Sequence, residues 1–277
     1  MRVINFNIKG AKVPGRKGYA TQERSWHLLA AYNADIALVQ EVEAKAIPDW
    51  VRQRWTIIKS EQDVFGNAMA GWGSVIAARP QLNLRVLPNL KNYQNLRLLY
   101  DYVVFGEIDL PNDSKALVAS VHTPAVKLQQ YLEQMGYPDI FTSDEMASMA
   151  QVGDLPWALD LFFVELAQLV KGHRFIIGGD WNNSRLFDLD RNLRKRGQPP
   201  FATMFFTRAQ DAGWCECHGL KNEERSYLNP RSRPHQLDHL FCDKVTYEKL
   251  DDCSVRADWV VFELSDHAPL VTDFKWL

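Results

Sequence analysis

The chain has 277 residues, of which 46% are hydrophobic and 24% are charged, a balance typical of globular proteins rather than of disordered or fibrous ones. Its 32 basic and 34 acidic side chains give a net charge of −2, which excludes a surface that is basic overall, so any contact with a polyanion must be local. No stretch reaches the ~20 apolar residues that a transmembrane helix needs. We therefore expect one globular domain over 1–277 without a membrane span.

The first predicted element is a strand over Val3–Ile8, and no charged segment with a long apolar stretch, as in a secretory leader, precedes it. The sequence thus predicts a cytoplasmic protein, although a leader that had already been removed would leave the same start. The cysteines are too few for a disulfide framework in a chain of this length, and reduced thiols are expected at Cys215, Cys217, Cys242 and Cys253.

The next predicted element is a helix over Thr21–Tyr32, where Thr21 can cap the first turn and apolar residues recur at helical spacing. Asp35–Gln40 is nearly all apolar and predicts a strand that is buried on both faces. Three further strands are predicted at Gly73–Ala78, Tyr102–Ile108 and Ala116–Val121.

The segment 124–155 is long for a connection between core strands, and it predicts a helical insertion over one edge of the fold. Within it, Thr142 and Glu145 have the spacing of a capping box. Helices are then predicted over Pro156–Val170, with Asp154 as its cap, and over Thr203–Ala212. The late strands are predicted at Phe175–Gly179, Leu237–Cys242, Trp259–Glu263 and Val271–Trp276. Together these elements indicate two packed mixed sheets with helices outside.

Polar residues recur where the apolar runs stop or begin, and they are the candidates for chemistry. They are Asn7, Glu41, His122, Asp180, Asn182, Asp238, Asp266 and His267. One such residue is usually a turn or a helix cap, but strand ends in layered α/β folds converge on one rim, where ligands bind. Several carboxylates at one buried rim are costly unless they are paired or bind a metal. The pattern therefore indicates a ligand site at a single rim.

The order of these motifs resembles the endonuclease/exonuclease/phosphatase superfamily from Asn7 to Leu270. The matching motifs are Asn7, Gln40-Glu41, Val121-His122, Gly179-Asp180-Trp181-Asn182, Leu237-Asp238-His239 and Ser265-Asp266-His267-Ala268-Pro269-Leu270. The GDWN motif, followed much later by SDHAPL, is the most specific pair. The resemblance implies a four-layer α/β/β/α sandwich of two mixed β-sheets flanked by helices, with a site for Mg²⁺ or Mn²⁺.

Magnesium prefers oxygen ligands and usually takes one or two carboxylates while keeping several waters. Glu41 is the first candidate ligand, with Asn7 orienting it or a metal-bound water. The resemblance also implies that Asp266 lies near the metal, directly or through water. A helix cap at Glu41 and a turn or cap at Asp266 are the alternatives.

Asp180 and Asn182 are two residues apart, so in extended chain both side chains point to the same side. Asp180 is expected to orient or deprotonate the attacking water, and Asn182 to donate to a phosphate oxygen. An Asx turn is the alternative for this stretch. The resemblance implies that His267 pairs with Asp238, and the roles of general base and of charge stabiliser stay open for His267.

His122 matches a histidine of the deoxyribonuclease, sphingomyelinase and phosphatase branches. The resemblance implies that His122 contacts the phosphate or acts as the acid that protonates the leaving group. The deoxyribonuclease branch pairs this histidine with a glutamate just before the strand that matches Ser74–Ala78. Here the stretch reads Gly71-Trp72-Gly73, which leaves the orienting partner of His122 open.

Basic residues near the motifs are the expected contacts to further phosphates, and Trp181 is expected to stack on bases or sugars. The expected contacts are Arg185, Arg231 and Arg233, with further clusters at Arg191, Arg194, Lys195 and Arg196 and at Lys9, Lys12, Arg16 and Lys17. For the cluster that follows the GDWN motif, a solvated surface is an equally good interpretation.

The sequence thus predicts a divalent-metal-dependent phosphodiesterase, first of all a nuclease that acts on DNA or RNA. A sphingomyelinase or inositol-phosphatase-like enzyme, acting on a phospholipid or a small phosphate ester, is the first alternative. A binding module that keeps the fold without catalysis is the second, and the intact candidates at every central position count against it.

Overall fold

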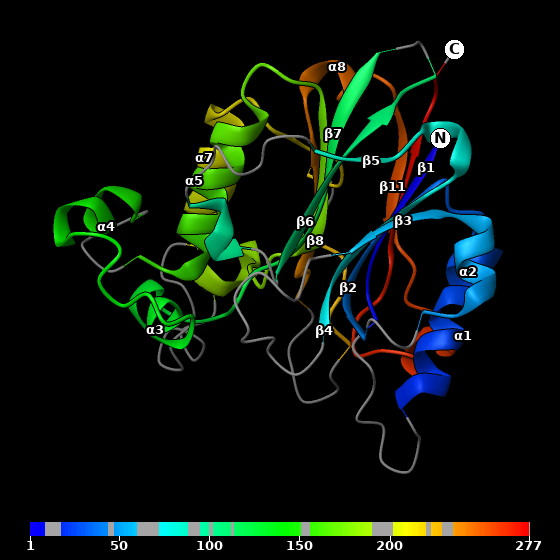
Figure 1. Cartoon of the computed structure of the whole chain (residues 1–277), viewed down its shortest axis with the longest axis horizontal. Helices are drawn as coiled ribbons and strands as arrows, with labels where there is room; N and C mark the ends of the chain where they lie inside the picture. The colour runs from blue at the N-terminus through cyan, green and yellow to red at the C-terminus, as the bar shows by residue number, and fades with distance from the viewer. Residues whose placement is uncertain are drawn as a thin grey trace.

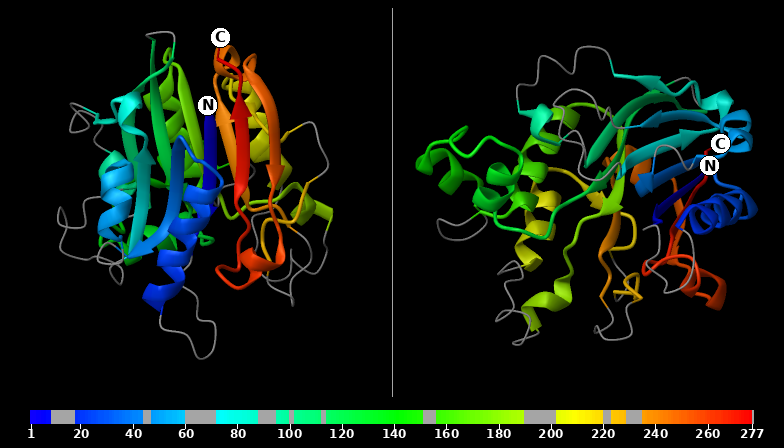
Figure 2. Two further views of the ribbon diagram at one scale, coloured as in Figure 1. Left: turned by 90° about the vertical axis from the view of Figure 1, so that its right-hand side faces the viewer. Right: turned by 60° about the horizontal axis from the view of Figure 1, so that its bottom comes forward.

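The computed structural model describes residues 1–8, 18–43, 47–59, 72–87, 95–99, 102–111, 114–150, 156–189, 202–219, 223–228 and 235–276. Two mixed six-stranded sheets pack face to face, and helices cover their outer faces (Figures 1 and 2). This arrangement confirms the layered α/β sandwich that the sequence predicted.

The first sheet has the strand order β11-β12-β1-β2-β4-β3. Only β1 and β2 run parallel in it, and the other neighbours are antiparallel. Its strands are β1 (Arg2–Asn7), β2 (Ile36–Glu43), β3 (Thr56–Lys59), β4 (Trp72–Ala78), β11 (Leu250–Val255) and β12 (Leu270–Phe274). Its outer face carries α1 (Gly18–Ala31) and α2 (Asp49–Arg54), which lie to the right in Figure 1. In Figure 2, β1 in blue lies beside β12 in red, so segments from both ends of the chain are neighbours.

The second sheet has the strand order β5-β6-β7-β8-β10-β9, with β7 and β8 parallel. Its strands are β5 (Arg85–Val86), β6 (Val103–Asp109), β7 (Lys115–His122), β8 (Phe175–Asp180), β9 (Cys215–Glu216) and β10 (Asp238–Cys242). Its outer face carries α5 (Ala158–Val170) and α7 (Ala202–Asp211). Two short helices, α3 (Leu128–Gln134) and α4 (Ser143–Met149), lie between β7 and α5, in the segment predicted as a helical insertion.

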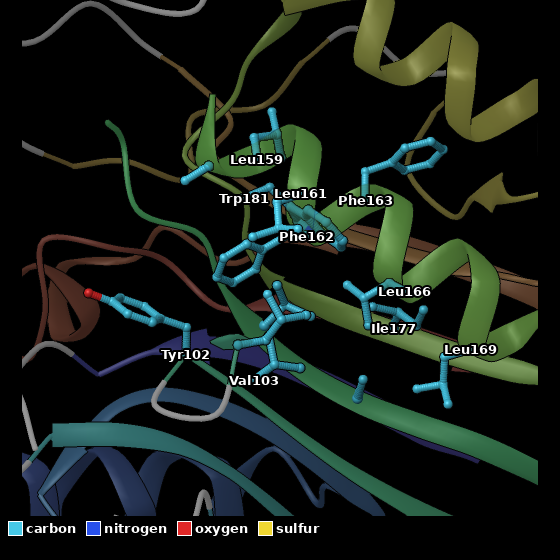
Figure 3. Close-up of a cluster of buried hydrophobic side chains, with 14 of the residues drawn as sticks. Tyr102, Val103, Leu159, Leu161, Phe162, Phe163, Leu166, Leu169, Ile177 and Trp181 are labelled. Carbon is cyan, nitrogen blue, oxygen red and sulfur yellow. The ribbon is translucent and has the colours of Figure 1, made fainter. Parts of the chain in front are cut away.

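Three apolar clusters fill the three interfaces between the layers, because side chains alternate across each strand. In β8, Ile176 packs between the two sheets, whereas Ile177 packs outward against α5. Figure 3 shows Ile177 beside Leu166 and Leu169 of α5. Each such buried side chain contributes about 1.5–3 kcal/mol of transfer free energy.

Several local predictions meet a clear outcome. The capping box is present, since the Thr142 side chain accepts from the Glu145 amide at 3.2 Å. The strand predicted over Trp259–Glu263 is wrong: the segment forms the helix α9 (Trp259–Phe262), and the Asp258 carboxylate caps it. A short apolar run does not distinguish strand from helix, and here the cap decides. The predicted cap Asp154 lies outside the described residues.

All four cysteines are free thiols, which confirms that prediction. The short helix α8 (Lys244–Tyr247) and the 3-10 segments Pro80–Leu82, Leu96–Leu99 and Arg185–Leu189 complete the described elements. Within the described ranges, no helix combines the length and the apolar character that crossing a membrane requires.

Candidate active site

Strand register brings the predicted residues to one edge of the sandwich. In the second sheet, His122 pairs with Asp180 across the parallel strands β7 and β8, and Asp180 pairs with Asp238 across the antiparallel strands β8 and β10. In the first sheet, Asn7 pairs with Gln40 at the same end of β1 and β2. The rim predicted from strand ends is therefore a continuous row of polar side chains.

Asn7 joins the two sheets at this rim. Ile4 and Phe6 of β1 pack against the helices, so Asn5 and Asn7 face the other sheet. The Asn7 amide donates to Glu41 Oε1 at 3.1 Å and to Asp180 Oδ2 at 3.1 Å. One fully buried amide thus holds two carboxylates, one from each sheet, within reach of the same point.

Glu41 reaches this point because the backbone of β2 is irregular there. The register with β4 shifts between Val39 and Val42, and Glu41 has a φ of 54°, in the left-handed region. That conformation costs a non-glycine residue about 1–2 kcal/mol. Val39 and Val42 both pack on the helix-covered face, so the extra residue turns the Glu41 carboxylate toward Asn7 instead.

Asp180 ends β8 after Gly179, where the strands come very close. A Cβ at Gly179 would lie 1.9 Å from the Val121 carbonyl oxygen, so a side chain does not fit there. Beyond Asp180 the chain turns. Asn182 has a φ of 47°, and its backbone N–H donates to Asp180 Oδ1 at 2.9 Å. This is the Asx turn given as the alternative, so the extended geometry assumed for Asp180 and Asn182 is wrong.

The side chain of Asn182 donates to the Thr123 carbonyl at 2.7 Å. It therefore fixes the loop after β7 to the loop after β8, beside the residues that end both strands. Its contact with a phosphate oxygen stays a prediction.

His267 and Asp238 form the predicted pair, with His267 Nδ1 donating to Asp238 Oδ2 at 2.8 Å. His267 Nε2 lies 3.5 Å from Asp180 Oδ2. Burial raises the pKa of Asp238. Burial alone would lower the pKa of His267, but the charges of Asp238 and Asp180 outweigh it and raise that pKa to about 10.

Ser265 ties this late segment to the first strand. Its hydroxyl donates to the Asn7 carbonyl at 2.7 Å and accepts from the His267 amide at 3.1 Å. Asp266 lies between them, and its negative charge also raises the pKa of His267. The half-buried Asp266 thus belongs to the same rim.

His122 has two acidic neighbours at this rim. Its Nε2 lies 3.8 Å from Glu41 Oε1 and 3.9 Å from Asp180 Oδ2. The side chain is 23% exposed, so a ligand at the rim can reach it. These two carboxylates, from β2 and β8, are longer than hydrogen-bond distance, so the orienting partner of His122 stays open.

The residues predicted for substrate binding fare differently. Trp181 is fully buried and packs on Phe205 and Phe241, so the stacking on bases predicted for it does not fit its position (Figure 3). Arg185 forms an ion pair with the buried carboxylate of Glu216 and lies 3.7 Å above the Phe206 ring, which differs from the predicted phosphate contact. Arg231, Arg233 and the other predicted basic clusters lie outside the described residues.

Sequence reasoning missed a buried ionic cluster behind the rim. His239 Nδ1 lies 2.7 Å from Glu216 Oε1, and its Nε2 lies 2.9 Å from the Asn183 carbonyl. Burial would raise the pKa of Glu216, but the hydrogen bonds and positive charges of His239 and Arg185 outweigh burial and lower that pKa to about 2. Burial would lower the pKa of His239, but the hydrogen bond and the negative charge of Glu216 outweigh burial and raise that pKa above its ordinary value. No motif marks Glu216, although His239 stands next to Asp238 in the sequence.

A second missed group is a polar layer between the sheets. Gln40 donates to Asn5 Oδ1 and to Ser120 Oγ, both at 2.9 Å, and Asn5 donates to Asp238 Oδ1 at 3.4 Å. The alternation in β1 would have placed Asn5 on the same face as Asn7.

A divalent cation fits the donor set at the rim. In the part of the chain that the structure describes, no three His, Cys, Asp or Glu side chains are arranged as a metal cage. Magnesium needs no such cage, because it takes one or two carboxylates and keeps its waters. Glu41 and Asp180 supply two carboxylates that share one amide donor, and Glu41 is 15% exposed. These oxygens suit Mg²⁺ or Mn²⁺ better than a soft metal.

The chain matches a known protein family over most of its length. A family model described as "Endonuclease/Exonuclease/phosphatase family" matches residues 4–267. No curated protein sequence matches the chain.

Solved structures of similar fold cover nearly the whole chain. The 3′ phosphatase NExo from Neisseria, bound to a product DNA hairpin, matches with a TM-score of 0.66 and 13% identity over 100% of both chains. An AP endonuclease from Archaeoglobus fulgidus matches with a TM-score of 0.62 and 15% identity over 100% of both chains. TDP2 from D. rerio, complexed with a single-strand DNA product, matches with a TM-score of 0.59 and 14% identity over 100% of this chain and 99% of that chain. At these identities the likeness concerns the fold.

Proposed function

Because this chain belongs to the Endonuclease/Exonuclease/phosphatase family, whose members hydrolyse phosphoric esters, we propose that it is a nuclease that hydrolyses phosphodiester bonds of DNA or RNA with Mg²⁺ or Mn²⁺. The observation that carries the proposal is the meeting of Glu41 and Asp180 at the Asn7 amide, with the imidazole of His267 3.5 Å from Asp180. Carboxylates and an imidazole at one partly accessible rim are groups that can carry out phosphate ester hydrolysis.

Glu41 would hold the cation, with Asp180 beside it and Asp266 in reach directly or through water. A divalent cation there would polarise a phosphoryl oxygen and offset its charge. Asn7 keeps the two carboxylates in place, because its amide donates to both of them. Asp180 then orients the attacking water and accepts its proton.

His267 acts in this proposal as a hydrogen-bond donor to the phosphate. Its Nδ1 is occupied by Asp238, and its Nε2 faces a carboxylate oxygen of Asp180, which favours a proton on both ring nitrogens. A protonated Nε2 stabilises the negative charge that develops on the phosphate oxygens. His122, which is partly exposed at the same rim, contacts the phosphate or protonates the leaving oxygen.

Nucleic acid is the favoured substrate class because two structures of the same fold hold DNA products, a hairpin and a single strand. The net charge of −2 does not oppose this, since the cation supplies positive charge at the site itself. Phosphate contacts outside the rim, by Arg231 and Arg233, remain part of the proposal.

The test is a substrate panel of plasmid DNA, single-stranded RNA, sphingomyelin and a phosphomonoester, each with Mg²⁺, Mn²⁺ or a chelator. We expect cleavage of a nucleic acid that the chelator abolishes and added cation restores. Asp180→Asn keeps the size of the side chain and should lower kcat by about 10²–10⁴-fold without unfolding the protein.

Each other outcome contradicts the proposal in a distinct way. Cleavage of sphingomyelin or of the phosphomonoester alone would replace the nuclease by the lipid or small-ester alternative. If the folded protein cleaves no substrate of the panel, the remaining hypothesis is a binding module without catalysis. Full activity of folded Asp180→Asn would remove Asp180 from the mechanism.

A further inference from the structure

The bulge in β2 interrupts the hydrogen bonding beside Glu41. Val39 pairs with Val75 and Val42 pairs with Gly73, so two residues of β2 stand opposite Ser74 alone. A bulge leaves backbone groups of the longer strand without ladder partners, and those groups need other partners when they are buried.

Gln22 of α1 supplies partners for the backbone at the bulge and directly after it. Its Nε2 donates to the Glu41 carbonyl at 3.0 Å, and its Oε1 accepts from the Glu43 amide at 3.1 Å. Gln22 is 1% exposed, so water does not compete for these bonds. Trp26 and Leu29 anchor α1 against the first sheet, which fixes Gln22 in front of the bulge.

We propose that Gln22 is a positioning residue, whose amide clamps the bulge in β2 and so holds the Glu41 carboxylate beside Asn7 and Asp180. The inference rests on the proposed function, because it assumes that the Glu41 carboxylate binds the cation. The Glu41 carbonyl belongs to the left-handed residue itself, and the Glu43 amide follows Val42. The Gln22 amide therefore holds the chain directly after the Glu41 Cα, which fixes the orientation of the peptide that follows Glu41.

The alternative conformation shows why a clamp is needed. In a regular strand, residue 41 follows the parity of Val39, which faces the helices rather than the second sheet. Relaxation of the bulge would therefore turn the carboxylate away from the rim. Because this pair of hydrogen bonds joins α1 to β2 at the bulge, Gln22 couples the first helix to the proposed metal site.

The decisive variant is Gln22→Met, which keeps the approximate length of the side chain and removes both hydrogen bonds. Two measurements apply: the Kd for Mn²⁺ from the electron paramagnetic resonance of unbound Mn²⁺, and hydrogen exchange of the Glu43 amide in the metal-free protein. We expect the Kd to rise about 10- to 100-fold, as for other residues that orient metal ligands, and the Glu43 amide to exchange faster. At saturating Mn²⁺, kcat should change less than the Kd.

Ser25→Ala is the matched control. Ser25 is fully buried in the same helix, and its hydroxyl donates to the Thr21 carbonyl at 3.1 Å, away from the bulge. This variant tests the packing of α1, and it should leave both the Mn²⁺ affinity and the Glu43 exchange unchanged.

A folded Gln22→Met protein with wild-type Mn²⁺ affinity and wild-type Glu43 exchange would overturn the inference. If Gln22→Met does not fold, Gln22→Glu replaces it, because its carboxylate still accepts from the Glu43 amide but cannot donate to the Glu41 carbonyl. For Gln22→Glu the Mn²⁺ affinity alone decides, because the Glu43 amide keeps its acceptor; wild-type affinity of this variant would overturn the inference. If the wild-type protein itself binds no Mn²⁺, the proposed function fails, and the exchange of the Glu43 amide still tests the clamp.

Discussion

Replacing Glu216 by glutamine should destabilise the fold by about 3 kcal/mol at pH 7. The Glu216 carboxylate, 6% exposed, lies between Arg185 and His239, which hold its pKa at about 2 against an ordinary value of 4.5. This lowering corresponds to about 3 kcal/mol at about 1.4 kcal/mol per pH unit. Loss of one partner from a buried ion pair costs about 3–5 kcal/mol, which agrees. Glutamine keeps the shape but leaves His239 without its anionic partner.

The effect should depend on pH with a defined sign. Since folding lowers the pKa of Glu216, its contribution is fully present above pH 4.5 and is lost as the pH falls toward 2. His239, whose pKa the same pair raises, adds stability that is present below pH 6.5 and declines as the pH rises through its folded-state value. The stability gap between wild type and Glu216→Gln should therefore be widest between these limits.

Urea unfolding followed by tryptophan fluorescence measures this gap, and thermal unfolding should show a Tm lower by about 6–12 °C. The control is Glu263→Gln, the same substitution in an exposed pair with Arg24, in which the Glu263 side chain is 42% exposed. An exposed pair contributes at most about 1 kcal/mol. Equal stabilities of Glu216→Gln and Glu263→Gln at pH 6 would refute the reasoning about the buried cluster.

Three further predictions concern the rim and its support. Gly179→Ala should destabilise the fold by about 1–3 kcal/mol, because the new Cβ would lie 1.9 Å from the Val121 carbonyl oxygen; an unchanged urea midpoint would contradict this. Trp181→Phe should cost stability but alter kcat/KM for nucleic acid less than about threefold, because a fully buried ring stacks on no base, and a selective rise in KM would restore the stacking role. Asn7→Ala should weaken Mn²⁺ binding about 10- to 100-fold, since Glu41 and Asp180 lose their shared donor, and calorimetric titration with Mn²⁺ checks it.

The rim itself follows from the sequence because strand ends and strand parity obey simple rules. The parallel pairing of β7 with β8 sets His122 beside Asp180, and the antiparallel return of β10 sets Asp238 in the same row. Each of these residues is marked by the end or the start of an apolar run, so their meeting was predictable. The pairing of His267 with Asp238 came from the resemblance and is present in the structure.

Other features depend on tertiary contacts that leave no local trace. The residues of β2 (Ile36–Glu43) do not reveal the bulge at Glu41, because the glutamine that contacts it belongs to the helix α1. Trp181 was predicted to stack on substrate from its place in the motif, yet the chain turns after Asp180 and buries the ring among Phe205 and Phe241. The positive charge of Arg185 would suit a phosphate contact, and only the fold shows that Arg185 forms an ion pair with Glu216 instead.

The pairing of β1 with β12 has a consequence for how the chain folds while it is being synthesised. A growing chain that has been translated only to Leu264 already contains Asn7, Glu41 and Asp180, but it lacks His267 and the strand that covers one edge of β1. Such a nascent chain lacks the His267–Asp238 pair, so its rim is incomplete. The rim can therefore be completed only after residues 265–274 have been synthesised, so its completion is a late step when the chain folds during translation.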